Sequence, residues 1–324
     1  MGLEKLRRGD RFPRRGVRGR LGSGLQTEGP EGVSPADRVR RPGFRERFAT
    51  LLPRALVAVV FVPILIWAGL ESSWQIWIII NASFALATVE WHRFAAAKAR
   101  RIRPSLFGAT VLLVLNTGFC PDPTALPLAL ALSVMAIAID RTLRSPVEGI
   151  TADLGVALAG VLYLGVLGSF LPRLLTIPDG LNAITNSVSL GSASFLMLLL
   201  MTWCTDTAAY FSGVLFGKHP LMPAVSPKKT VEGLAGGVAG AAFGGWIASV
   251  TFAPFLGPWH GLGLGAALAV IGQLGDLVES SLKRDAGVKD ASKILPGHGG
   301  ILDRLDSLLF TAPCAYAFLH LVVL

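Results

Sequence analysis

The chain has 324 residues, of which 52% are hydrophobic and 16% are charged, and its formal net charge is +9. A typical soluble domain has roughly 25% charged residues, so this composition excludes an ordinary soluble protein and a disordered one. The three cysteines show neither CxxC nor Cys/His spacing, which excludes a disulfide framework and a thiolate metal site. We therefore predict an all-α polytopic integral membrane protein.

The first 50 residues differ from the rest of the chain. They contain thirteen Lys and Arg residues against six Asp and Glu, with glycine and proline scattered among them. No helical or strand period is visible, so we predict a disordered basic tail on the cytoplasmic side. Beside a membrane span, such a tail favours anionic lipid headgroups over nucleic acid as its partner.

Apolar stretches long enough to cross about 30 Å of hydrocarbon follow the tail. We predict nine transmembrane helices, with the N-terminus in the cytoplasm. The predicted spans are 52–70, 74–91, 104–120, 125–140, 150–171, 192–216, 232–252, 258–279 and 305–324. Within one of them, Gly236, Gly240 and Gly244 recur at every fourth position, a spacing that lets membrane helices pack closely.

The charge distribution supports this topology. With nine spans, 29 of the 30 Lys and Arg residues lie on the cytoplasmic side and only Arg173 lies outside, as the positive-inside rule requires. We assign residues 51–190 to the N-terminal transmembrane helices. Residues 191–324 are assigned to a C-terminal catalytic region, whose most informative segment is 280–306.

Several acidic residues lie in or beside the predicted spans. Asp206 lies within an apolar run, where an unpaired carboxylate costs several kcal/mol, and we predict a functional role for it. The acidic residues nearer to helix ends, for which a structural role is favoured, are Glu90, Asp140 and Asp153.

A basic loop precedes the span at 232–252. In the run Ser226–Gly233, Pro227 fixes a turn, two adjacent lysines follow, and Thr230 is placed to cap the next helix. The glycine-rich cradle of a phosphate-binding Walker loop is absent. Two interpretations stay open for this run, a positively charged cytoplasmic loop with a helix cap and a functional loop.

The segment 275–307 has the densest charge of the chain outside the tail, with six acids, five bases and one histidine. Asp276, Ser280 and Lys283 share one helical face by their spacing. Asp303 and Asp306 share another face, at the start of the last predicted helix, and a glycine-rich turn containing His298 lies between the two groups.

This combination of residues suggests a definite chemistry. Carboxylate oxygens suit Mg²⁺, which keeps several waters and bridges substrate phosphates. Lysine and arginine suit the remaining phosphate charge. The segment therefore predicts phosphoryl or nucleotidyl transfer to a lipid, against the alternative of a salt-bridged cytoplasmic loop flanked by helix caps.

These residues resemble the signature of the phosphatidate cytidylyltransferases, also called CDP-diacylglycerol synthases. The resemblance covers about 27 consecutive residues at unbroken spacing, in the runs Ser280–Arg284, Lys289–Asp290, Pro296–Gly300 and Asp303–Asp306. Upstream, the runs Asp206–Tyr210 and Ser226–Gly233 also look like that family. The N-terminal half matches only as generic transmembrane helices.

The resemblance implies that CTP and phosphatidate react to form CDP-diacylglycerol and pyrophosphate. It also implies Mg²⁺ as cofactor, with one or two ions bound. The residues that it implies as metal ligands are Asp276 and Asp303, with Asp306 and Asp290 as further candidates. Those implied to hold the triphosphate or the leaving pyrophosphate are Lys283, Arg284, Lys289 and His298. Further substrate-binding candidates are Lys228, Lys229, Arg304 and Ser280, with Thr230 and Glu232 positioning their loop.

Two other classes of protein stay open. A transporter would place its polar groups near the membrane midplane, in repeated halves, whereas here the charges lie at cytoplasmic helix ends and no repeat is evident. A lipid-alcohol kinase that uses CTP or ATP is the nearest enzyme alternative. We expect a multi-pass protein of the inner (plasma) membrane with a cytoplasmic active site. Its expected partners are CTP, phosphatidate and membrane lipids, without nucleic acid, and a homodimer stays open.

Overall fold

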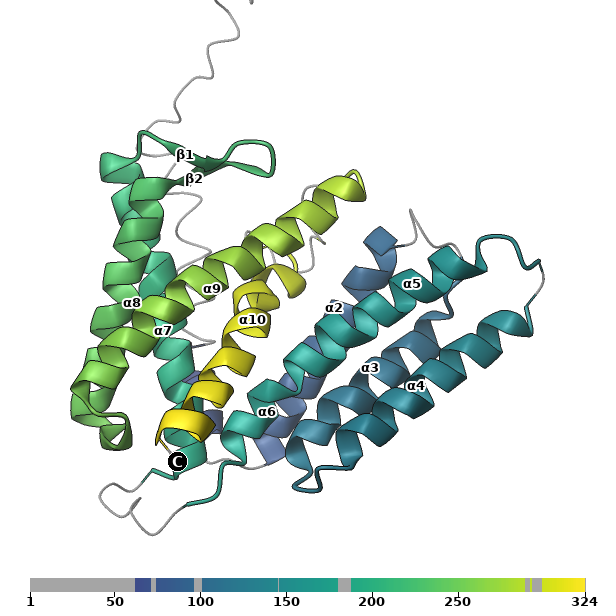
Figure 1. Ribbon diagram of the computed structural model, residues 1–324, viewed down its shortest axis with the longest axis horizontal. Coiled ribbons are helices and arrows are strands. Elements are labelled where there is room, and N and C mark those ends of the chain that lie inside the picture. Colours follow the sequence, from purple (N-terminus) through teal and green to yellow (C-terminus); the bar gives the residue numbers. More distant parts are fainter. Residues whose placement is uncertain are drawn as a thin grey trace, which may run out of the picture. The chain divides into compact units, whose positions relative to one another are not determined.

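The computed structural model describes residues 62–70, 74–95, 101–144, 146–179, 188–288, 292 and 299–323. They belong to one compact unit, Arg47–Leu324, whose regular structure is almost entirely helical (Figure 1). Helices suit so apolar a chain, because a helix satisfies its own backbone hydrogen bonds where water is absent. The predicted tail at 1–50 lies outside the described residues, and the predicted division at residue 190 stays a prediction.

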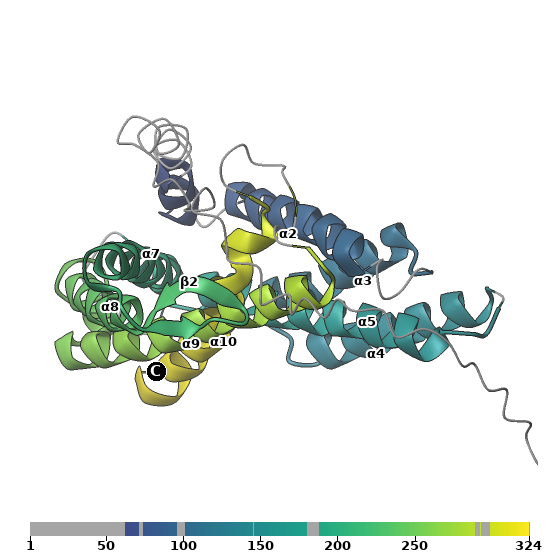
Figure 2. The ribbon, with the colours of Figure 1, turned by 90° about the horizontal axis from the view of Figure 1, so that it is seen from above.

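The first part of the described chain is a set of helices joined by short turns. Residues 62–70 are helical, and the helices that follow are α2 (Trp74–Ala95), α3 (Pro104–Asn116), α4 (Ala125–Thr142), α5 (Ile150–Gly160) and α6 (Phe170–Leu175). The 3₁₀ turn η2 (Thr117–Phe119) extends α3, and the π-helical segment η3 (Val161–Val166) leads from α5 towards α6. Figures 1 and 2 show α3, α4 and α5 side by side.

The second part contains the longest helices. Its elements are α7 (Leu190–Phe216), β1 (Pro220–Met222), β2 (Ser226–Thr230), α8 (Val231–Thr251), the 3₁₀ turn η4 (Pro254–Leu256), α9 (Pro258–Asp285), α10 (Leu302–Phe318) and the π-helical η5 (Leu319–Val323). The strands pair antiparallel, Pro220 with Thr230 and Met222 with Ser226. The all-α prediction omitted this hairpin, because the polar run of β2 has no apolar alternation.

Two helix ends lie further into the charged segment than hydropathy predicted. The predicted span 258–279 continues as helix to Asp285, and Gly287 follows in the left-handed region with φ of 74°, as is common just past a helix end. The last helix begins at Leu302 instead of 305. The connection between the predicted spans 258–279 and 305–324 is therefore shorter than those spans imply, because charged residues continue both helices.

Small residues bring α7, α8 and α9 close together. A methyl group on Gly240 would lie 2.8 Å from the carbonyl oxygen of Cys204, and one on Gly244 would lie 3.0 Å from the Cys204 sulfur. The predicted packing role of the glycines in α8 is thus confirmed. Such close approach matters within a membrane, where lipid leaves no hydrophobic force to drive helices together.

Six of the described helices are long and apolar enough to span a membrane. They are Ala125–Thr142, Ile150–Leu175, Leu190–Phe216, Val231–Thr251, Pro258–Asp285 and Leu302–Val323. Each coincides with a predicted span, so a multi-pass architecture is confirmed. Of the other predicted spans, 104–120 corresponds to a shorter apolar helix, 74–91 lies within α2, and 52–70 lies partly outside the described residues. The count of nine stays a prediction.

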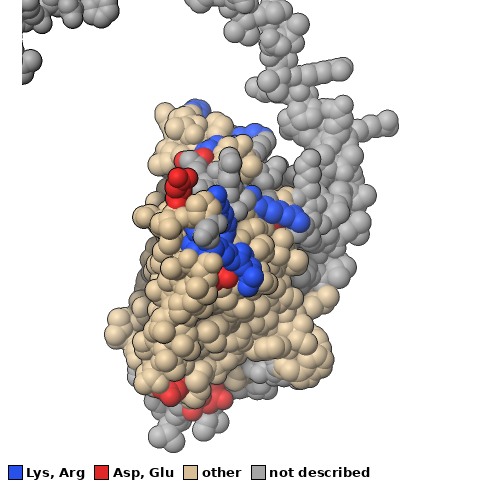
Figure 3. Space-filling model, turned by 90° about the vertical axis from the view of Figure 1, so that its right-hand side faces the viewer, with Lys and Arg blue, Asp and Glu red and all other residues tan. Residues whose placement is uncertain are grey.

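Charge is segregated along one face of the molecule. In Figure 3, Lys and Arg side chains gather in the upper part of the face, above a band of uncharged residues. Only acidic charged side chains are visible at the lower end. This distribution agrees with the topology that the positive-inside rule predicts, and the orientation itself stays a prediction.

Helix α10 lies at the centre of the described chain. It packs against α9, α7, α6 and α2, and its Leu302 and Leu309 are fully buried. The N-terminus of α10, which carries the last residues of the predicted signature, therefore lies where helices from both parts of the chain meet.

Candidate active site

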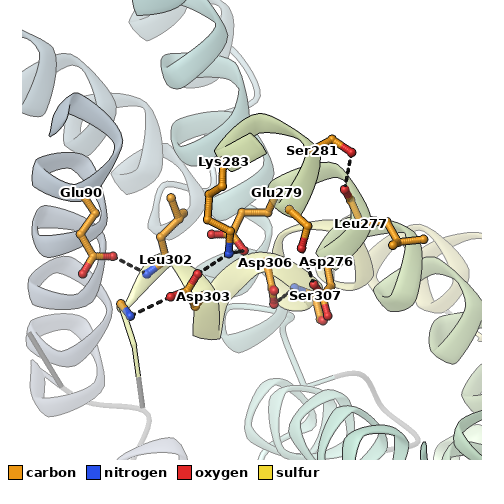
Figure 4. Close-up of polar contacts among 12 residues, drawn as sticks. Glu90, Asp276, Leu277, Glu279, Ser281, Lys283, Leu302, Asp303, Asp306 and Ser307 are labelled. Carbon is orange, nitrogen blue, oxygen red and sulfur yellow. Dashed lines mark hydrogen bonds and ion pairs between the residues drawn. The ribbon is translucent and has the colours of Figure 1, made fainter. Parts of the chain in front are cut away.

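A buried lysine joins the last turns of α9 to the first turn of α10. Lys283 is 8% exposed, and its Nζ lies 3.1 Å from Glu279 Oε2 and 2.5 Å from Asp303 Oδ1. Figure 4 shows Lys283 pointing from α9 towards Asp303. Glu279 is fully buried, so the lysine offsets two carboxylates that are largely removed from water. Lys283 is therefore salt-bridged, but it lies within α9 and is buried, not in a solvated loop.

The backbone before α10 holds Asp303 from its other side. The Gly300 N–H donates to Asp303 Oδ2 at 2.8 Å. Gly299 has φ of 77°, and a Cβ there would lie 2.7 Å from the same oxygen. Glycine is therefore required at this position by conformation and by space. Both oxygens of Asp303 are thus fixed, one by a lysine and one by the backbone.

A glutamate from the distant helix α2 closes the N-terminus of α10. Glu90 is fully buried, and its Oε2 accepts from the Leu302 N–H at 2.7 Å (Figure 4). Its Oε1 accepts from the Ile301 N–H at 3.0 Å. Oε1 also accepts from the Ser292 hydroxyl. The sequence favoured only a structural role at a helix end for Glu90 and did not connect it with this segment.

Asp276, one turn of α9 before Glu279, belongs to a second charged group. Its carboxylate pairs with Lys229 of β2 and accepts from the Ser280 hydroxyl at 3.2 Å. Arg284 Nε donates to the Val225 carbonyl oxygen at 3.4 Å, which ties the hairpin to α9 a second time. The sequence predicted that Asp276, Ser280 and Lys283 share one helical face. Ser280 does bind Asp276, whereas Lys283 binds Glu279 and Asp303 instead.

A polar pocket opens beside Asp276 between α7, α9 and α10. Asp206 and Asp276 both line it, together with Thr202, Gln273, Ser307 and Thr311. The buried Nε2 of Gln273 has no hydrogen-bond partner among the described residues. Asp306 is 8% exposed and lies close enough to Asp206 and Asp276 to interact with them electrostatically. Asp206, singled out as an isolated carboxylate in an apolar run, therefore has acidic neighbours.

The base of the hairpin is fixed by two side chains of the predicted loop. The Thr230 hydroxyl accepts from the Gly233 N–H at 3.1 Å and caps α8, as predicted. Glu232 accepts from the backbone N–H groups of Lys218 and His219 at 3.1 and 3.2 Å, and the His219 ring lies 2.6 Å from its other oxygen. These contacts fix β2 at the start of α8, and the pair with Asp276 holds Lys229 against α9.

The remaining predicted site residues divide into two sets. Lys228, Arg284 and Arg304 are exposed, and they adjoin Lys229, Lys283 and Asp303 in the sequence. Lys289, Asp290 and His298 lie outside the described residues, and their roles stay predictions. Sequence reasoning missed Glu279 and Glu90. Glu279 had a weak signal, because it precedes Lys283 by four residues, the spacing of a helical ion pair.

The described acidic residues supply the carboxylate oxygens that Mg²⁺ prefers, but they do not form a full set of ligands by themselves. Within the part of the chain that the structure describes, no three His, Cys, Asp or Glu side chains gather into a ligand group. Mg²⁺ needs only one or two protein carboxylates, since waters and substrate phosphates complete its shell. Asp276 and Asp306, with hydroxyl and amide oxygens around them, fit that requirement. Both oxygens of Asp303 and both oxygens of Asp276 already have partners, so a metal ion at either residue would displace one of them. Of the two residues, Asp276 is the one that lines the polar pocket.

The apolar helices and this charged site define a multi-pass membrane protein with lysines and carboxylates gathered at the ends of its helices. The sequence model of the cytidylyltransferase family matches residues 52–322, and the chain belongs to this family. The match includes the N-terminal helices, which the motifs alone described only as generic spans.

Curated relatives agree with the family assignment. The chain is 34% identical over 265 residues to the phosphatidate cytidylyltransferase of Staphylococcus aureus (strain COL), covering 81% of this chain and 95% of the relative. It is 38% identical over 215 residues to the phosphatidate cytidylyltransferase of Staphylococcus haemolyticus (strain JCSC1435), covering 65% of this chain and 76% of the relative. The family named from the motifs is thereby confirmed.

Proposed function

We propose that this chain is a phosphatidate cytidylyltransferase, which transfers the cytidylyl group of CTP to phosphatidate and releases pyrophosphate. One observation carries the proposal. In a member of the cytidylyltransferase family, Lys229 and Lys283 come from separate segments and each lies on a carboxylate of α9 or α10. Lysines and acids are therefore gathered at one end of the helices, where two phosphate-bearing substrates need both.

The site suits a reaction whose difficulty is charge. The phosphate of phosphatidate is ionised at neutral pH, so its oxygen attacks the α-phosphorus of CTP without a strong general base. The obstacle is the repulsion between two polyanions. Fixed cations reduce it and align the reacting atoms. Lys283 is fixed by two carboxylates, so its ammonium needs no reorganisation when phosphate arrives.

We assign the other candidate residues to three tasks: binding the triphosphate, binding the remaining phosphates and holding the metal ion. We assign Lys283, Arg284, Lys289 and His298 to the triphosphate or the departing pyrophosphate, and Lys228, Lys229 and Arg304 to phosphatidate or nucleotide phosphates. Asp276 and Asp306 would hold Mg²⁺, with Asp303 and Asp290 as further candidates. When bound, Mg²⁺ supplies additional charge neutralisation at the phosphate oxygens.

The proposed site faces the cytoplasm of the cell, at the inner (plasma) membrane. Two features support this side. CTP is a cytoplasmic nucleotide, and nearly all lysines and arginines of the chain fall in segments that the predicted topology places inside. The segregation of charge in Figure 3 agrees with the same orientation.

Two labels on CTP test the proposal. Purified protein in detergent is supplied with phosphatidate, Mg²⁺ and CTP labelled either at the α- or at the γ-phosphate. A cytidylyltransferase moves only the α-label into the lipid fraction and releases the γ-label in pyrophosphate. Label in lipid from γ-labelled CTP, with diacylglycerol as acceptor, would instead establish the lipid-alcohol kinase alternative. Lipid that takes up neither label would contradict both.

A further inference from the structure

Glu90 joins the N-terminal helices to the segment that contains the proposed active site. It lies on α2, yet its three partners, Ser292, Ile301 and Leu302, are more than 200 residues further along the chain. All three partners donate hydrogen bonds, and the carboxylate accepts them with both oxygens. Its side chain has no exposure to solvent. The three donors therefore take the place of the water molecules that burial removes from the carboxylate.

The position of Glu90 is itself rigidly determined. Its helix neighbours Phe84, Ala87 and Trp91 are buried in the core. On the opposite side, a Cβ at Gly300 would lie 2.6 Å from Glu90 Oε2, so the backbone approaches the carboxylate as closely as a glycine allows. A negative charge also suits the N-terminus of α10, where backbone N–H groups point out of the helix.

The contacts of Glu90 continue directly into the charged site. Glu90 fixes the N–H groups of Ile301 and Leu302, and the neighbouring Gly300 N–H fixes Asp303. Asp303 in turn holds the ammonium of Lys283. A shift of the backbone at 300–302 would therefore move Asp303 and Lys283 together, although Glu90 touches neither of them.

We propose that Glu90 is a positioning residue for cytidylyl transfer, which sets the start of α10 and through it Asp303 and Lys283. The inference deepens the proposed function and rests on it. It gives the N-terminal helices a part in the active site beyond anchoring in the membrane. A misplacement of about 1 Å at a catalytic group costs up to about 100-fold in rate, so the effect should appear in turnover.

The experiment compares Glu90→Gln with Asp153→Asn. Asp153 is also a buried carboxylate of the N-terminal part, 6% exposed. It pairs with Arg141 at 2.7 Å, and no contact with a described residue of the signature is found for it. Glutamine keeps the size of Glu90 but presents an N–H group where one backbone N–H needs an acceptor. Each variant is assayed for kcat, for the KM of both substrates, and for hydrogen–deuterium exchange in the peptide that contains Ile301 and Leu302.

For Glu90→Gln we expect kcat to fall at least about tenfold, with both KM values within about threefold of wild type. Exchange at Ile301 and Leu302 should accelerate. Asp153→Asn should lower thermal stability without changing kcat or that local exchange. Wild-type turnover, or unchanged exchange at 301–302, in a folded Glu90→Gln protein would overturn the inference. So would an equal loss of kcat in Asp153→Asn.

Two safeguards keep the test decisive. If Glu90→Gln does not fold, Glu90→Asp keeps the charge and shortens the reach; wild-type turnover in that folded variant would overturn the inference, and a lower kcat with faster exchange would support it. If the wild-type protein transfers no cytidylyl group, the proposed function fails. The exchange measurement then still decides whether Glu90 fixes the start of α10.

Discussion

Lys283→Met should destabilise the protein far more than the loss of an ordinary ion pair. Methionine keeps most of the length and the apolar stem of lysine, but it leaves the carboxylates of Glu279 and Asp303 without their shared cation. An exposed pair contributes at most about 1 kcal/mol, whereas removing one partner of a buried pair costs about 3–5 kcal/mol. Since Lys283 is 8% exposed and Glu279 is fully buried, the larger figure applies.

The assay is thermal unfolding in detergent, combined with steady-state kinetics for CTP and phosphatidate. At about 2–4 °C per kcal/mol, the apparent Tm of Lys283→Met should fall by about 6–20 °C. The double variant Glu279→Gln/Lys283→Met removes the fully buried acid and should recover at least half of that loss. Its turnover should stay at least about 100-fold below wild type, because no cation has been restored near the phosphates.

The matched control is Arg144→Met. Arg144 and Asp140 form an ion pair with the same four-residue spacing, at 3.0 Å, but the Arg144 side chain is 34% exposed. Its loss should cost less than about 1 kcal/mol and leave turnover unchanged. If Lys283→Met and Arg144→Met melt within about 2 °C of each other, the argument from burial is refuted. If the double variant regains wild-type turnover, the catalytic role of Lys283 is refuted.

Three further outcomes test the site and the tail. Asp303→Asn should lower turnover at least about 100-fold while membrane insertion survives, and near-normal turnover would remove Asp303 from the catalytic group. Deletion of residues 1–48 should leave specific activity in detergent within a few-fold of wild type, because no proposed site residue lies there; a well-inserted but inactive truncation would contradict this. Lys289→Ala should lower kcat and kcat/KM for CTP together, because charge grows on the departing pyrophosphate. Unchanged CTP kinetics would make Lys289 structural.

Hydropathy located the helices well but misjudged their ends at the site. A span is predicted to end where charges begin, so the predicted span ended at 279, although the spacing of Asp276, Ser280 and Lys283 indicated a shared helical face beyond that point. The structure continues α9 to Asp285, because Glu279 and Lys283 pair four residues apart within the helix and thereby support it. The charged residues are therefore held on rigid helices, which a count of apolar residues does not reveal.

Long-range partners were beyond the reach of local patterns. The motif at 280–306 identified the family and most of the candidate residues, because their types and spacing are adjacent in sequence. The partners of Asp276 and of Leu302 are Lys229 and Glu90, and no periodicity connects residues that are 47 and 212 positions apart. That Asp206 and Asp276 line the same pocket depends in the same way on how α7 and α9 pack.

The pair between Lys229 and Asp276 leads to a last prediction, on the magnesium requirement. If Asp276 is a ligand of Mg²⁺, the ammonium of Lys229 and the metal ion compete for the same carboxylate. The two side chains are 22% and 32% exposed, so their attraction amounts to at most about 1 kcal/mol, which corresponds to about fivefold in an equilibrium constant. Lys229→Met should therefore lower the Mg²⁺ concentration for half-maximal activity by up to about fivefold.

The same variant should also raise the KM of a phosphate-bearing substrate if Lys229 holds it. A magnesium titration of turnover at saturating CTP measures the first effect, and substrate kinetics at saturating Mg²⁺ measure the second. Lys218→Ala serves as the control, because Lys218 is an exposed lysine beside the same hairpin. Among the described residues, its contact with a carboxylate is made by the backbone N–H and not by the side chain. A higher magnesium requirement in Lys229→Met would mean that the lysine and the metal ion cooperate, and competition at Asp276 would be refuted.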